Sequence, residues 1–181
     1  MPSASLIPHD PTVLFTLAGF AGIVVSVTGN ETTQRFGRNR VVIGAIGAAA
    51  ALSLAAGWSI AVSAALAALL VVLWNAAIYL DSSALTAGTV QAADPALRGA
   101  TMGLHSMAGY SGGFIGPLGV GLLLDLASGS EVLGWGLGFG HLAVVTLAGL
   151  GTMRWLARRP RPQAEPETLA SVKLIPEKSD R

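Results

Sequence analysis

The sequence contains no cysteine, which excludes a disulfide-stabilised scaffold and any metal site built on thiolates. Charged residues are scarce as well, at 12% of 181 residues, against about 25% in a typical soluble domain. Hydrophobic residues make up 52%, so there is too little polar surface to cover a water-soluble globule. The same balance excludes disorder over most of the chain. A net charge of +1 gives no reason to expect a nucleic-acid partner.

The few charges are separated by long stretches without Asp, Glu, Lys or Arg. A membrane-spanning helix needs about 20 apolar residues to cross a hydrocarbon core of about 30 Å. The longest stretch, residues 41–80, is long enough for two spans and divides near Trp58, a residue type suited to the membrane–water interface. We therefore predict an all-α membrane protein with five transmembrane helices, at residues 12–30, 41–57, 61–91, 99–125 and 134–156.

The eleven basic residues support this division, because all of them fall on one side of the membrane. The positive-inside rule makes that side cytoplasmic. We therefore expect an extracytoplasmic lead (1–11), a transmembrane domain (12–156) and a proline-containing disordered cytoplasmic tail (157–181) in the plasma (inner) membrane. No positive charge precedes the first span, so we do not interpret it as a signal peptide.

The fourth predicted span is rich in glycine. Helices in lipid associate through close packing at small residues, and Pro117 is expected to kink this helix. The glycines either only allow helix packing or let kinked helices rock past one another. Those that share a face or form small-xxx-small pairs are Gly109, Gly112, Gly113, Gly116 and Gly119.

The segment between the first two spans, residues 30–40, reads Asn-Glu-Thr-Thr-Gln-Arg-Phe-Gly-Arg-Asn-Arg. It resembles the loop motif Gly-x-x-x-Asp-Arg-x-Gly-Arg-Arg of the major facilitator superfamily. Gln34 stands at the acidic position, which in the family forms a charge relay with neighbouring arginines. The resemblance implies gating positions at Arg35, Gly37, Arg38 and Arg40.

A second stretch, residues 94–103, resembles a later loop of that superfamily through the pair Arg98 and Gly99. The helix after it resembles helix eleven through Gly116 and Pro117. In register, the five spans resemble helices eight to twelve of a twelve-helix transporter. The resemblance thus implies part of the C-terminal half of such a bundle, a small-molecule substrate of unknown identity, and a complementary N-terminal half that supplies the rest of the substrate path.

The third span carries a polar stripe within a narrow arc of the helix. Polar groups at this depth are expected to face protein or water rather than lipid, so they either bond to other helices or line a cavity. The stripe consists of Asn75, Tyr79, Ser82, Thr86 and Thr89.

Asp81 lies on the same helix outside that stripe, and His105 lies at a similar depth on the next span. One interpretation places Asp81 in headgroup water and His105 in a neutral packing bond. The other joins them as a pair that couples transport to protons. His141 on the fifth span is interpreted as a packing histidine.

Catalysis has little support in the sequence. There is no thiol nucleophile, no His-Glu-x-x-His motif and no pair of carboxylates spaced for glycosidic chemistry. We expect no enzyme activity, no cofactor and no metal. Two hypotheses remain: a portion of a secondary transporter, as a truncated product or one part of a two-part assembly, and a non-transporting membrane remnant or helix-packing partner.

Overall fold

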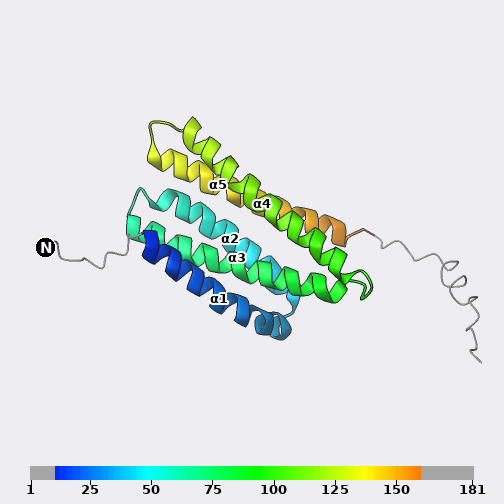
Figure 1. Ribbon diagram of the computed structural model, residues 1–181. Helices are drawn as coiled ribbons and strands as arrows, with labels where there is room; N and C mark the ends of the chain where they lie inside the picture. Colours follow the sequence, from blue (N-terminus) through cyan, green and yellow to red (C-terminus); the bar gives the residue numbers. More distant parts are fainter. Residues whose placement is uncertain (1–10, 160–181) are drawn as a thin grey trace, which may run out of the picture.

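The computed structural model describes residues 11–159, and within this range the chain forms five long α-helices and no strand (Figure 1). Each helix is long and apolar enough to cross a membrane, as predicted. Lipid offers no hydrogen-bond partner to the backbone, and a helix satisfies its own N–H and C=O groups. The helices are α1 (Pro11–Phe36), α2 (Arg38–Ser59), α3 (Ala64–Ala92), α4 (Arg98–Leu126) and α5 (Glu131–Ala157). Most of the predicted lead and tail lies outside the described residues.

Short polar turns separate the helices at both ends of the bundle. Ser63 caps α3 by accepting a bond from the Ala65 amide at 3.2 Å. Ser130 caps α5 in the same way, through the Leu133 amide at 3.3 Å. These side chains satisfy amides that the first helical turn leaves without partners. The connections are therefore tight, and consecutive helices run in opposite directions (Figure 1).

The segments predicted as gating loops are mostly helical, which corrects the expected boundaries. α1 continues through the polar residues 31–35 and ends at Phe36, and α2 begins directly after Gly37. Gly37 alone breaks the helix, with φ of 85°, a conformation that costs glycine nothing sterically. Arg98 and Gly99 likewise lie in the first turn of α4. A helix can extend beyond the hydrocarbon because water solvates its polar side chains there.

The helices form a bundle in which α2 is central. α2 packs against α3 on one side and α5 on the other, while α1 lies on α3 and α4 lies on α5 (Figure 1). α3 and α4 are consecutive but make few contacts. The buried cluster joins Val42 and Ile46 of α2 to Ala84 of α3, with Leu85 and Leu150 against it.

The closest approach between α2 and α5 occurs at two glycines. A Cβ built on Gly57 would lie 2.9 Å from the Trp135 carbonyl oxygen and 3.1 Å from the Gly136 Cα. One turn earlier on α2, Ser53 Oγ donates to the Phe139 carbonyl oxygen at 2.7 Å. The Trp58 ring in turn packs over Gly136. Because lipid-exposed helices gain little from burying apolar surface, such close contact is what holds them together.

The glycines of α4 behave differently. A Cβ built on Gly109, Gly112, Gly113 or Gly116 would meet no other atom within 4 Å. Within residues 11–159 they therefore pack against no other helix, and no residue of α4 is buried. The packing role predicted for this face, and for the Pro117 kink beside it, stays a prediction about a partner beyond the described helices.

We predict that Gly57→Leu destabilises the bundle by about 1–3 kcal/mol, because the new side chain meets the α5 backbone. Gly47→Leu is the matched control, since a Cβ at that position on α2 meets nothing within 4 Å; it is expected to stay within about 0.5 kcal/mol of the parent. Unfolding by sodium dodecyl sulfate in mixed micelles measures both. Equal stability of the two variants would contradict the close α2–α5 contact.

Candidate functional site

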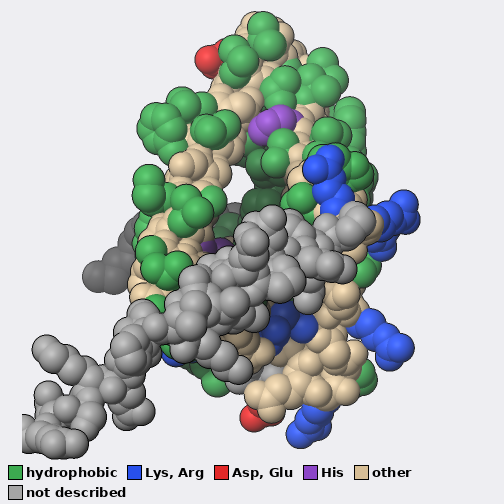
Figure 2. Space-filling model, turned by 90° about the vertical axis from the view of Figure 1, so that its right-hand side faces the viewer, with side chains coloured by type: hydrophobic (Ala, Val, Ile, Leu, Met, Phe, Trp, Pro, Cys, Tyr) green, Lys and Arg blue, Asp and Glu red, His purple; other side chains and the backbone are tan. Residues whose placement is uncertain are grey.

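Arginine side chains gather at one end of the bundle, where α1, α3 and α5 end and α2 and α4 begin (Figure 2). Arg35, Arg40 and Arg98 are exposed there. Arg159 lies over the Trp155 ring, 3.6 Å from its centroid. We refer to this region as the basic end. The opposite end, with the turns at Ser63 and Ser130, carries no Lys or Arg in the described chain.

Arg38 differs from the other arginines of the basic end because it is held between two helices. Its Nη2 donates to Gln91 Oε1 in the last turn of α3 at 2.7 Å. Its Cδ lies 3.0 Å from a Cβ built on Gly88, so a side chain at that position would displace it. The contact brings a cation to the negative end of the α3 dipole. The Nε atom is buried without a partner in the structure.

Gln91 and Gly88 were not singled out in the sequence. Their spacing of three residues places them on one face of α3, with the glycine leaving room and the amide supplying the acceptor. That pattern is visible in the sequence, but only the fold shows that Arg38 faces it.

We predict that Gln91→Leu loosens the junction between α1 and α2, because it removes the bond that holds Arg38. A hydrogen bond to a charged group contributes about 1.5–3 kcal/mol, so amide exchange at residues 37–41 is expected to rise roughly tenfold or more. Gln34→Leu, an exposed glutamine on α1, is the control and leaves that exchange unchanged. Hydrogen–deuterium exchange in nanodiscs tests this, and unchanged exchange in Gln91→Leu would contradict it.

The polar stripe of α3 divides between two neighbouring helices. In the half away from the basic end, Asn75 Nδ2 donates to the Ala18 carbonyl oxygen of α1 at 2.8 Å. The Tyr79 ring packs over Gly22 of α1, where a Cβ would come within 2.7 Å of it. These contacts attach α1 to α3, and the Tyr79 side chain is still 42% exposed.

Nearer the basic end, Thr86 Oγ1 lies 3.2 Å from His105 Nε2 of α4. Thr86 is therefore the hydrogen-bond partner of His105 in the structure. Asp81 Oδ1 is buried without a hydrogen-bond partner, and Ser82 is exposed. The structure thus brings Thr86 and His105 together and shows no hydrogen bond between Asp81 and His105.

His141 of α5 packs against α4, as interpreted from the sequence. Its ring lies 2.7 Å from a Cβ built on Gly119, so a larger residue at that position would displace the ring. Gly119 is the glycine of the predicted α4 face that does contact another helix. The interaction is one of packing, and His141 Nδ1 has no hydrogen-bond partner.

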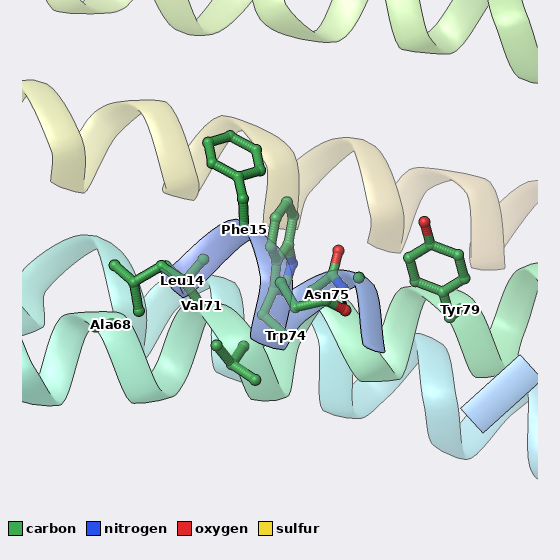
Figure 3. Close-up of a pocket in the computed structure, with 10 residues that line it drawn as sticks. Leu14, Phe15, Ala68, Val71, Trp74, Asn75 and Tyr79 are labelled. Atoms are coloured by element: carbon green, nitrogen blue, oxygen red, sulfur yellow. Dashed lines mark hydrogen bonds between the residues drawn. The ribbon is translucent and has the colours of Figure 1, made fainter. Parts of the chain in front are cut away.

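A cavity of about 510 Å³ lies between α1 and α3, in the half of the bundle away from the basic end (Figure 3). Phe15, Trp74 and Tyr79 supply aromatic rings, and Asn75 supplies an amide. An adjoining cavity of about 370 Å³ continues toward α2 and α5. The cavity thus includes the first two residues of the predicted polar stripe. The remaining lining residues are Leu14, Ala18, Gly19, Ala68, Val71 and Val72.

A family model described as Major Facilitator Superfamily matches residues 4–178. The chain belongs to the major facilitator superfamily. The match covers the five helices, and it confirms the resemblance noted in the sequence, although it does not assign their places among the helices of the family. No curated protein and no solved structure matched the chain.

As a member of this superfamily, the chain is a membrane transporter protein, and the lipid bilayer is its environment. Gln34, which the motif resemblance aligns with the acidic position, is exposed on α1. Arg38 bonds to the Gln91 side chain of α3. No group of three or more His, Asp or Glu side chains that could hold a metal ion occurs among the described residues.

Proposed function

We propose that the five helices form one wall of a pathway for a small solute in a secondary transporter. Helices beyond the described five supply the facing wall. The observation that carries this proposal is the open cavity on α1 and α3, which exposes Asn75 and Tyr79 in a chain of a transporter superfamily. Ligand sites of such transporters are formed near the midplane between two halves.

The unpartnered face of α4 supports the same proposal. Gly109, Gly112 and Gly116 offer space for close helix contact that no described helix uses. A complementary N-terminal half is the partner that this face would accept. The alternative is a remnant or packing partner without substrate, and the uptake experiment below separates the two.

We propose that Asp81 alone couples transport to protons, and that it does so without forming a pair with His105. Burying one carboxylate oxygen without a partner inside a membrane span is costly, and such residues are usually functional. His105 already bonds to Thr86 and serves to hold α4 near α3. Asp81→Asn in the assembled transporter is therefore expected to abolish the dependence of uptake on a proton gradient, whereas His105→Gln keeps it.

We predict that the chain takes up solute in proteoliposomes only together with a complementary N-terminal half. Uptake across a broad panel of radiolabelled solutes is compared for the chain alone, the half alone and both together. Arg38→Ala is expected to reduce uptake by both at least tenfold with an unchanged amount in the membrane, because the α2–α3 contact is lost. Asn39→Ala, at an exposed neighbouring position, is the control and is expected to leave uptake unchanged. Absence of uptake by the two parts together would favour the alternative, a membrane remnant or packing partner without substrate.

The orientation is proposed from the basic end: it faces the cytoplasm, so the N-terminus is outside and the C-terminus inside. Because the chain has no cysteine, a single introduced cysteine shows on which side of the membrane its position lies. Ser63→Cys and Ser128→Cys are expected to react with an impermeant maleimide added outside intact cells, and Pro95→Cys only after lysis. Labelling of all three from one side would overturn the five-span topology.

A further inference from the structure

The cavity between α1 and α3 has the size of a small-molecule site. Its volume of about 510 Å³ falls within the range of about 300–1,000 Å³ seen for ligand pockets. In Figure 3 the side chains of Phe15, Trp74 and Tyr79 extend toward the same side as the Asn75 amide. Trp74 is held in place by an edge contact with Phe139 of α5, with ring centroids 5.4 Å apart. The aromatic surface is therefore partly preorganised.

The polar groups of this cavity are few and uncharged. One amide hydrogen of Asn75 is donated to the Ala18 carbonyl oxygen, which leaves Oδ1 as an acceptor and the second amide hydrogen as a donor. No Asp, Glu, Lys, Arg or His lines the cavity. A cation would gain about 0.5–2 kcal/mol from the aromatic faces but would lose several kcal/mol of hydration. Desolvation therefore outweighs the attraction, and charged solutes are disfavoured.

The dimensions of the cavity favour a solute over another helix. Its lining on α3 runs from Ala68 to Tyr79, a length of about 17 Å at 1.5 Å per residue. A packed transmembrane helix would need a groove along the full hydrocarbon thickness, about 30 Å. A lipid chain would fill the space without offering a donor to Asn75, leaving a polar atom without a partner.

We infer that this cavity binds an uncharged, flat aromatic solute that carries one hydrogen-bond donor, such as a phenolic hydroxyl. The rings of Phe15, Trp74 and Tyr79 contact the aromatic body, and Asn75 Oδ1 accepts the donor. The inference rests on the proposed function only in naming this solute a transported substrate.

The test uses the full chain in nanodiscs, with 2-naphthol as the probe and empty nanodiscs subtracted to remove partitioning into lipid. Equilibrium dialysis compares 2-naphthol with naphthalene-2-sulfonate and with 2-naphthyltrimethylammonium. Saturable binding of 2-naphthol at least tenfold tighter than of either ion supports the site. Absence of saturable 2-naphthol binding, or tighter binding of either ion, would overturn the inference. Absence of saturable binding is also the result expected if a lipid chain occupies the cavity.

Two substitutions locate the binding. Gly19→Leu fills the cavity from α1, and the fold accommodates it because a Cβ there meets nothing within 4 Å; a tenfold or greater loss of affinity is expected. Gly44→Leu, equally open but on α2 outside the cavity, is the matched control and binds as the parent does. Equal binding by both variants would place the ligand elsewhere and contradict the inference.

The hydrogen bond from the solute to Asn75 is tested separately. The parent chain is expected to prefer 2-naphthol over 2-methoxynaphthalene, which cannot donate, by about tenfold, and Asn75→Leu to lose that preference. A preference that persists in Asn75→Leu would contradict the role of Asn75. Binding of 2-naphthol without uptake by the reconstituted assembly would count against transport and leave the site standing. Uptake of another solute without 2-naphthol binding would contradict the binding site and leave the proposed transport standing.

Discussion

The structure depends on the close approach of α2 to α5 at Gly57 and Gly136. Apolar side chains face lipid about as readily as they face one another, so the bundle gains little from hydrophobic burial. The absent side chains at these two positions let the backbones meet, and the bond from Ser53 to the Phe139 carbonyl fixes their register. α2 packs against α5 on one side and against α3 on the other. The remaining helices lie outside these three, α1 against α3 and α4 against α5.

The position of the candidate sites follows from this arrangement. α1 is attached through α3, by the Asn75 bond to Ala18 and by the Tyr79 contact with Gly22. The cavity lies along this contact between α1 and α3. α4 is attached mainly through α5, where His141 packs over Gly119. It makes few contacts with α3, among them the bond between Thr86 and His105. The proposed pathway therefore has only one wall within these five helices.

Much of the fold could be predicted from the sequence, because charge placement and helix length are dictated by the bilayer. The five spans and the packing of His141 were visible in residue patterns. The helix contacts were not. The glycines of α4 have the strongest packing pattern, yet Gly57, Gly88 and Gly136 make the close contacts, since a pattern shows where a helix can pack and not which helix is present. The contact between Arg38 and Gln91 depends on residues 53 positions apart, which periodicity cannot relate.

Disulfide cross-linking in native membranes tests the central position of α2 most directly, because the chain has no cysteine of its own. Val42→Cys is paired with Ala84→Cys across α2 and α3, and Ser53→Cys with Phe139→Cys across α2 and α5. A third pair, Ser53→Cys with Gly112→Cys, joins α2 to the open face of α4. The first two pairs are expected to cross-link rapidly with copper phenanthroline and the third not at all. Cross-linking of the third pair in preference to the second would contradict the arrangement described.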